Sequence, residues 1–159
     1  MKIVVLKFGG TSVGTIEKIK KVTDIIIEHK KKKNKVIVVS SAMSGVTNDL
    51  IKKSKQISNN FIDSEYDVLV SSGEQVACSL IAGRLNHKGF KSRSWLGWQI
   101  PIFTNGPYTN SRIQQVNKNK LLRFLKEGGI PIITGFQGVN MNERVTTIGR
   151  GGSDASAIM

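Results

Sequence analysis

The sequence has a single cysteine, Cys78, and only two histidines, His29 and His87. A lone cysteine forms no disulfide within its own chain, and its apolar neighbours predict a small buried side chain rather than a nucleophile. The histidines stand apart, without a cysteine or carboxylate cluster at metal-ligand spacing. We therefore expect neither a disulfide-stabilised fold nor a metal ion held directly by the protein, and we expect a reducing, cytoplasmic location.

Long hydrophobic runs are also missing. No stretch of about 18 uninterrupted apolar residues occurs, so the sequence predicts no membrane partner. The apolar run nearest the N-terminus covers only Ile3–Leu6, which is too short for the core of a signal peptide. With 39% hydrophobic residues in a chain of 159, the composition instead predicts one globular domain with a buried core.

Acidic residues are scarce: 11 of them stand against 24 lysines and arginines, which gives a net charge of +13. Such a charge is one sign of a small nucleic-acid-binding module. The lysines are spread along the chain, however, and their densest run, His29–Lys35, closes a predicted helix, where cations complement the C-terminal carbonyls. Arginines and aromatic residues do not interleave as they do in readers of RNA or DNA. We therefore expect no nucleic-acid partner.

Strand and helix patterns alternate along the chain. Continuous apolar runs predict buried strands at residues 3–6, 36–39 and 130–134, with weaker strand patterns at 91–95 and 100–104. Apolar residues at helical spacing predict helices over residues 15–32, from 46 onward, from the capping-box pair Ser72 and Gln75 to Gly89, and around 121–125. This order is typical of an α/β fold whose mainly parallel sheet is covered by helices on both faces.

A phosphate-binding turn is indicated where the first predicted strand ends. Lys7, Phe8, Gly9 and Gly10 leave the strand and lead, through two hydroxyl residues, into a helix. Paired glycines let backbone N–H groups approach a ligand, and a helix N-terminus beside a lysine favours an anion. The order of lysine and glycines differs from that in the GxxxxGK[ST] loop and in GxGxxG. A tight strand-to-helix turn with an incidental lysine is the alternative.

A second cluster of candidate residues lies near the end of the sequence. Arg150, Gly151, Gly152, Ser153 and Asp154 bring together a guanidinium, two flexible backbone positions, a hydroxyl and a carboxylate beside a predicted helix start. Arginine binds carboxylates through paired hydrogen bonds, and glycines expose backbone N–H groups to anions. A plain helix cap at Ser153 or Asp154 is the alternative. Capping alone requires neither the arginine nor the glycines.

Three further side chains are candidates for a ligand site. Glu74 is expected in the first turn of its helix, where it either suits the helix dipole or holds a substrate ammonium group. Thr47 follows the small residues after the second predicted strand, and its hydroxyl either caps a helix or contacts a ligand. Ser41 lies at the carboxyl end of that strand, which is where ligands sit in parallel α/β sheets.

Seven segments in fixed order carry a family resemblance: KFGGTSV, VVSSAMSGVTN, SSGEQV, GWQ, TNSRI, TGFQG and TTIGRGGSDASA. On these motifs, which extend over essentially all 159 residues, the chain resembles the N-terminal part of the aspartokinases, within the amino-acid kinase superfamily. The resemblance implies a three-layer αβα sandwich of the amino-acid kinase (carbamate kinase-like) type, in truncated form. Residues 1–159 would be the N-terminal part of the catalytic domain, with the nucleotide-binding half and the regulatory domains absent from this chain.

The resemblance also implies an activity. This is the ATP-dependent phosphorylation of the β-carboxylate of L-aspartate to 4-phospho-L-aspartate, the first step towards lysine, threonine, methionine and diaminopimelate. ATP would carry Mg²⁺, with no direct protein ligand to the ion. The implied catalytic residues are Lys7 and Asp154, and those implied for ATP phosphate binding are Lys7, Phe8, Gly9 and Gly10. Those implied for substrate binding are Ser41, Thr47, Glu74, Arg150, Gly151, Gly152 and Ser153, with Glu74 at the ammonium group and Arg150 at the α-carboxylate.

Two alternatives to an active kinase stay open, because the family's catalytic domain extends beyond these segments. The chain could be a non-catalytic fragment that keeps the aspartate half-site. It could also be a subunit that requires a partner, either the missing C-terminal half or further copies of itself.

Overall fold

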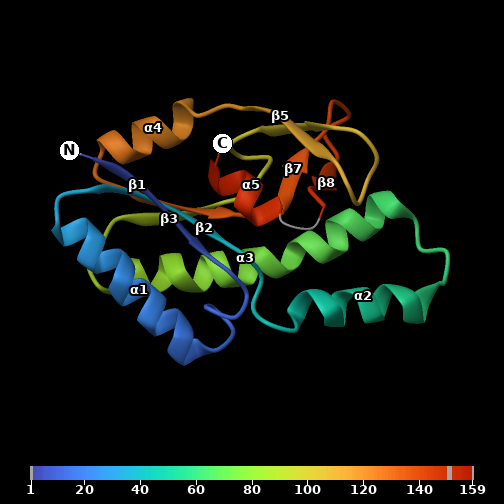
Figure 1. The fold of residues 1–159 in the computed structure, drawn as a ribbon, viewed down its shortest axis with the longest axis horizontal. Helices are drawn as coiled ribbons and strands as arrows, with labels where there is room; N and C mark the ends of the chain where they lie inside the picture. Colours follow the sequence, from blue (N-terminus) through green and yellow to red (C-terminus); the bar gives the residue numbers. More distant parts are fainter. Residues whose placement is uncertain (1, 150–151, 159) are drawn as a thin grey trace.

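The computed structural model describes residues 2–149 and 152–158 of the chain. Two of the candidate residues, Arg150 and Gly151, lie outside the described residues. The described part is an α/β structure built on two four-stranded sheets (Figure 1).

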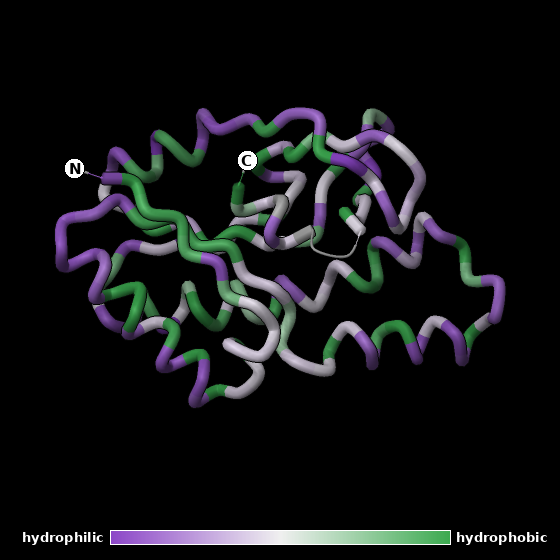
Figure 2. Tube along the Cα trace, viewed as in Figure 1, coloured by the Kyte–Doolittle hydropathy of each residue, from purple (hydrophilic) through white to green (hydrophobic). Residues whose placement is uncertain are grey.

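The first sheet is entirely parallel and forms the centre of the molecule. Its strands are β1 (Ile3–Phe8), β2 (Lys35–Ser40), β6 (Ile130–Thr134) and β3 (Ser92–Trp95), in the spatial order β1-β2-β6-β3. Figure 2 shows hydrophobic residues concentrated along β1 and β2, although Ile3 and Val5 of the edge strand β1 are 49% and 45% exposed. The predicted parallel α/β core is confirmed, and the carboxyl ends of β1, β2 and β6 meet at one edge of the sheet.

Helices cover both faces of this sheet, so the molecule has three layers (Figure 1). The helices α1 (Ile16–Lys31) and α3 (Asp63–His87) lie on one face, over a core that includes Ile26, Ile81 and Ile132. The shorter helices α4 (Asn119–Lys126) and α5 (Gly152–Ile158) lie on the other face, where Trp95 and Ile133 are buried.

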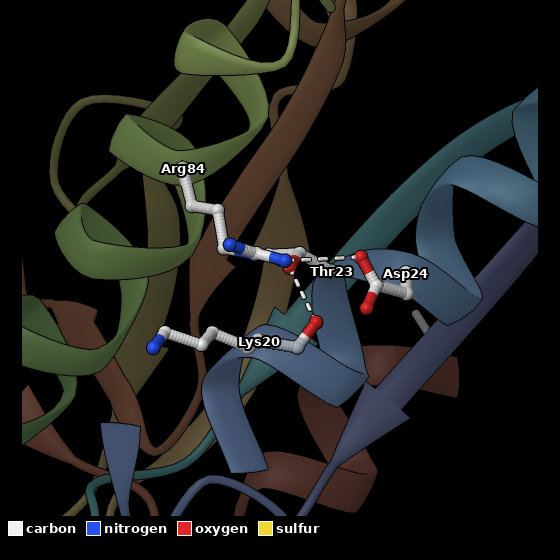
Figure 3. A network of polar contacts seen from close by, with 4 residues as sticks. All are labelled: Lys20, Thr23, Asp24 and Arg84. Atoms are coloured by element: carbon white, nitrogen blue, oxygen red, sulfur yellow. Dashed lines mark hydrogen bonds and ion pairs between the residues drawn. The ribbon is translucent and has the colours of Figure 1, made fainter. Parts of the chain in front are cut away.

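Polar contacts join the two helices of the first layer. Arg84 of α3 donates from Nε to Thr23 Oγ1 at 2.6 Å and forms an ion pair with Asp24 of α1 at 3.2 Å (Figure 3). The lysine run closes α1 as predicted, with His29, Lys30 and Lys31 in its last turn. These contacts fix α3 to the lysine-rich helix α1.

The second sheet was not predicted. It consists of β5 (Arg112–Val116), β4 (Ile102–Asn105), β7 (Gln137–Val139) and β8 (Val145–Thr147), in that spatial order. The pairs β4–β5 and β7–β8 are antiparallel, and only β4–β7 is parallel. The strand predicted at 100–104 corresponds to β4 (Ile102–Asn105) and thus belongs to this sheet. The other three strands escaped prediction because they are short and lack a continuous apolar run.

The start of α3 was also predicted wrongly. The capping-box pattern placed it at Ser72, whereas α3 begins at Asp63. The Ser72 hydroxyl donates instead to the Leu69 carbonyl one turn earlier, at 2.7 Å, so the pattern is an ordinary helix-interior contact. The helix between β2 and α3 is α2 (Val46–Ile57), and it packs against α3.

Cys78 is fully buried on α3, as predicted, and burial raises the pKa of its thiol. In the part of the chain that the structure describes, no three histidine, cysteine, aspartate or glutamate residues are grouped closely enough to hold a metal ion. Within the same residues, no helix combines the length and the apolar character needed to span a membrane.

Candidate active site

A cavity of about 420 Å³ opens at the carboxyl edge of the parallel sheet. Seven of the candidate residues line it: Lys7, Gly10, Ser41, Thr47, Glu74, Ser153 and Asp154. They come from β1 and the turn after it, the loop after β2, α2, α3 and α5, so segments distant in sequence converge where parallel α/β sheets bind ligands.

An ion pair lies at this cavity. The Lys7 Nζ, at the end of β1, is 2.8 Å from Asp154 Oδ1, in the first turn of α5. The side chains are 31% and 63% exposed, so both reach solvent and an incoming ligand. A lysine amine held by one carboxylate keeps further N–H donors for an anion.

The two glycines after Lys7 differ in what surrounds them. A Cβ at Gly9 would lie 3.7 Å from Lys7 Nζ, an ordinary contact that leaves the amine in place. A Cβ at Gly10 would lie 3.0 Å from the Ala42 carbonyl oxygen, so close packing against the loop after β2 favours glycine there. Gly10 lines the cavity, whereas the Phe8 side chain packs against the hydrophobic core beside α1 and α3. Only the backbone of Phe8 is therefore placed to take part in ligand binding.

Glu74 is a buried carboxylate at the cavity wall, with an exposed fraction of only 3%. Its Oε1 accepts a hydrogen bond from the Ala42 N–H at 3.3 Å, while Oε2 has no partner among the described residues. Burial raises the pKa of Glu74 to about 7, against its ordinary value of 4.5. Because α3 begins at Asp63, Glu74 lies well inside the helix, and the first-turn prediction for it is wrong. The helix dipole therefore does not account for this carboxylate.

Hydroxyl groups supply the remaining polar wall. The Ser41 hydroxyl donates to Ser153 Oγ at 3.0 Å and so joins the end of β2 to the first turn of α5. Gly135, directly after β6, makes this approach possible, because a Cβ there would lie 2.6 Å from Ser153 Oγ. Since α5 begins at Gly152, Ser153 and Asp154 lie within its first turn, and both are engaged in contacts to other segments.

Thr47 lies in the first turn of α2, and its hydroxyl is not the helix cap. The cap position is Gly45, which has a left-handed φ of +85° and makes no side-chain cap bond. Glycine suits that conformation because it has no Cβ. Because Gly45 occupies the cap position, Thr47 lies inside the helix, and its side chain lines the cavity.

Some residues around the cavity were missed by the sequence analysis. Met43, Ser44, Asn48 and Phe136 also line it. Phe136 has a left-handed φ of +68°, which is uncommon outside glycine. The flanking glycines of TGFQG were the signal for a special turn there, but nothing in the sequence indicated which way the ring points.

Asp67, which lies outside the lining of the cavity, was also missed by the sequence analysis. It is fully buried on α3, two turns before Glu74, and accepts hydrogen bonds from the N–H groups of Thr109 and Thr147 and from the Thr147 hydroxyl. The distances are 2.7–3.0 Å. Thr147 ends β8, so Asp67 fixes the strand from which the chain proceeds to Ser153 and Asp154.

The fold and the cavity define an α/β protein with a small-molecule site at the carboxyl edge of a parallel sheet. Comparison with known families is more specific: the model of the amino acid kinase family matches residues 2–159. The chain belongs to the amino acid kinase family.

Among curated proteins, the chain is similar to aspartokinases. It is 48% identical to the aspartokinase of Geobacillus stearothermophilus over 158 residues, which are 99% of this chain and 39% of that protein. It is 45% identical to the aspartokinase of Rickettsia conorii over 162 aligned residues, which cover 100% of this chain and 40% of that protein. The chain thus spans about two fifths of the length of these curated relatives.

Solved structures agree with the fold. The aspartate kinase of Synechocystis superposes with a TM-score of 0.82 at 37% identity, covering 99% of this chain and 26% of that one. The Escherichia coli aspartokinase III complex with aspartate and ADP gives a TM-score of 0.82 at 24% identity, covering 97% of this chain and 45% of that one. At that lower identity the likeness concerns the fold alone.

Proposed function

We propose that this chain provides the aspartate-binding and phosphoryl-facing part of an aspartate kinase, which transfers a phosphoryl group from ATP to the β-carboxylate of L-aspartate. The observation that carries the proposal is the pairing, in one cavity, of a solvent-accessible Lys7–Asp154 ion pair with a buried, half-unpaired Glu74. The likeness to curated aspartokinases at 42–48% identity supports the choice of substrate.

To recognise aspartate, the site must offer a negative group to its α-ammonium group and hydrogen-bond donors or positive groups to its carboxylates. The free Oε2 of Glu74 is the acceptor for the α-ammonium group, and the ammonium charge would lower the pKa of Glu74 and keep it ionised. Hydroxyl groups of Ser41, Thr47 and Ser153 line the same cavity and offer donors to carboxylate oxygens. Arg150, with Gly151 and Gly152, remains our candidate for the α-carboxylate on the sequence pattern alone.

Phosphoryl transfer to a carboxylate requires positive potential more than it requires a base. The β-carboxylate is already ionised at neutral pH, since its reference pKa is about 3.9. Positioning and electrostatic stabilisation supply most of the catalysis in such transfers. In the proposal, Lys7 and the backbone N–H groups of Gly9 and Gly10 face the phosphoryl oxygens, and Asp154 orients the Lys7 amine.

A magnesium ion would arrive with the nucleotide, whose phosphates supply part of its ligands. Among the described residues, Asp154 is the exposed carboxylate of the cavity. When bound, Mg²⁺ neutralises charge on the phosphates. Lys7 then has to balance only the charge that develops on the transferring group.

We further propose that residues outside this chain bind the adenine and ribose of ATP, because the relatives are more than twice as long. The product would be 4-phospho-L-aspartate, the first intermediate towards lysine, threonine, methionine and diaminopimelate. On this proposal, the chain alone binds aspartate, and turnover depends on whether the nucleotide-binding part is supplied.

The test is ADP release by the purified chain with Mg-ATP, with and without L-aspartate, beside a Lys7→Ala variant. Aspartate-dependent release that is lost in the variant supports the kinase. Thermal stabilisation by L-aspartate, without ADP release, supports the half-site that requires a partner. A folded chain that neither releases ADP nor is stabilised by aspartate would overturn the proposal.

A further inference from the structure

A second cavity, of about 650 Å³, is lined by β3, the edge strand of the parallel sheet, by the turn after β3 and by α4. It shares no lining residue with the active-site cavity. A volume of this size holds a small organic ligand. Most of its lining side chains are aromatic or basic, namely Trp95, Trp98, Phe124, Arg93, Lys120 and Arg123.

The basic side chains of this cavity lack carboxylate partners. Neither Arg93 nor Arg123 forms an ion pair among the residues that the structure describes. The Lys120 amine donates to the backbone carbonyl of Gln99, at 3.3 Å, which leaves its positive charge uncompensated. Cations that line one cavity without paired acids favour an anionic ligand.

The acidic residue among those that line the cavity is already paired with a different cation. Glu127 Oε2 lies 2.7 Å from the Nζ of Lys91, which is outside the lining. The hydrogen bond from Lys91 and the charge of Lys91 lower the pKa of Glu127, with a smaller contribution from Arg123. This carboxylate therefore stays ionised and bound, and the cavity keeps the charges of Arg93, Lys120 and Arg123 for a ligand.

Aromatic rings lie beside these charges. The Arg93 guanidinium lies over the Trp95 ring, 4.0 Å from its centroid, a contact that holds the guanidinium while its N–H groups remain for an anion. Phe124 meets the Trp95 ring edge to face, with centroids 5.9 Å apart. Trp95 Nε1 is buried and has no acceptor among the described residues, so this wall keeps an unpaired donor. Trp98 is 51% exposed, and a flat ring from solution can therefore reach its face.

We propose that this cavity binds a nucleoside monophosphate, with the phosphate at Arg93, Lys120 and Arg123 and the base on Trp98. A phosphate monoester carries a charge of about −1.5 to −2 at neutral pH, so it matches these cations better than a single carboxylate does. Guanidinium groups bind phosphate oxygens through paired hydrogen bonds. A base stacks on an exposed aromatic ring without requiring a particular set of hydrogen-bond partners. Inorganic phosphate would leave the rings unused, and a bare nucleoside would leave the charges unpaired.

Tryptophan fluorescence reports on this site directly, because the chain has two tryptophans and both line the cavity. Titration with AMP should quench the emission in a saturable way, and equilibrium dialysis should give the same dissociation constant. Adenosine and ribose 5-phosphate are the two halves of this probe, and in competition with AMP each should bind at least about tenfold more weakly. AMP that does not bind, or that binds without changing the emission, contradicts the proposal, and so does a half that binds as tightly as AMP.

A pair of charge reversals on α4 separates a phosphate contact from general attraction to a positive chain. Arg123 lines the cavity, whereas Lys126, on the same helix, is exposed and outside the lining. Arg123→Glu should raise the dissociation constant for AMP by about tenfold or more, and Lys126→Glu should change it by less than about threefold. The two variants have the same net charge, and circular dichroism checks that both fold. Equal effects of the two changes would reject the site.

Two further variants locate the base and separate this site from the active-site cavity. Trp98→Leu should weaken AMP by about fivefold or more and leave the binding of ribose 5-phosphate unchanged, because only the base stacks. Lys7→Ala should leave AMP binding unchanged, since Lys7 lines the other cavity. Loss of AMP binding in Lys7→Ala would assign the nucleotide to the active-site cavity and overturn the proposal. A single-stranded oligonucleotide that binds far more tightly than AMP would replace the small ligand by a nucleic-acid strand, which also overturns it.

Discussion

The Nζ of Lys7 lies 2.8 Å from Asp154 Oδ1, so one ion pair joins the end of the first strand to the start of the last helix. The two residues are separated by almost the entire chain and meet only because β1 and α5 lie against each other. In the proposed reaction this pair holds the amine beside the transferring phosphoryl group. Substitution of either residue should therefore lower the rate of transfer.

Lys7→Ala should lower kcat for aspartate-dependent ADP release by about 100-fold or more, with little change in the KM for aspartate. Removing a charge aimed at the developing negative charge affects the transition state more than the bound substrate. Steady-state kinetics over a range of aspartate concentrations measures the two effects separately. Lys18→Ala, at an exposed position of α1, is the control. A variant that raises only the KM would show that Lys7 binds substrate rather than assists transfer.

Asp154→Asn should also lower kcat, but by less than Lys7→Ala, since the amine remains and only its orientation is relaxed. Its effect on folding should be small, below about 1 kcal/mol, because the carboxylate is 63% exposed and well screened by water. Kinetics and chemical denaturation on the same preparation give both values. If Asp154→Asn unfolds the chain, or exceeds Lys7→Ala in its effect on kcat, the orienting role assigned to it is wrong.

The sequence predicted residues that line the cavity better than it predicted the second sheet, for a physical reason. Lys7 lies at the end of β1, Ser41 follows β2, and Ser153 is bonded to Ser41. Buried parallel strands are continuous apolar runs, which can be recognised from a single sequence. The strands β5, β7 and β8 are short and half polar, so their pairing depends on distant partners and leaves little local pattern.

Glu74 and Asp67, both on α3, show the same limit: local sequence pattern does not reveal burial that depends on distant segments. The capping-box pattern placed the start of α3 too late, and this placed Glu74 at a helix end instead of in the buried middle. Asp67 lies before the predicted start of that helix, in a segment for which the sequence predicted no element, although it is fully buried on α3. Burial of a carboxylate is decided by the N–H groups that come to it from elsewhere, here from Thr109 and Thr147.

Glu74 should make stability depend on pH. Its folded pKa of about 7 lies above its ordinary value of 4.5, so the folded chain keeps a proton that the unfolded chain releases between those values. The free energy of unfolding should therefore fall as pH rises from about 4.5 to about 7, and stay lower above it. Glu74→Gln should flatten this dependence and stabilise the chain at pH 8 by up to about 3 kcal/mol. Urea denaturation at pH 5 and pH 8 measures the difference, with Glu17→Gln on exposed α1 as control.

Aspartate binding should show the opposite dependence on pH, since the ammonium group requires the ionised form of Glu74. With a pKa of about 7 in the free protein, affinity at pH 6 should be roughly tenfold lower than at pH 8. Glu74→Gln should abolish binding while stabilising the fold. Titration calorimetry at the two pH values gives the affinities. An affinity that is the same at both, or a Glu74→Gln variant that still binds, would remove Glu74 from the ammonium site.

Asp67→Ala should destabilise the chain by about 3 kcal/mol or more, because it leaves the N–H groups of Thr109 and Thr147 and the Thr147 hydroxyl buried without an acceptor. Asp67→Asn should cost less but still weaken the fold, since its amide nitrogen cannot accept from these donors. Urea denaturation measures both, and Asp49→Ala on the exposed side of α2 should change stability by less than about 1 kcal/mol. Because Thr147 leads towards Ser153, the Asn variant should also bind aspartate more weakly under conditions where it remains folded. An Asp67→Ala chain as stable as the Asp49→Ala control would show that α3 and β8 are held together by other contacts.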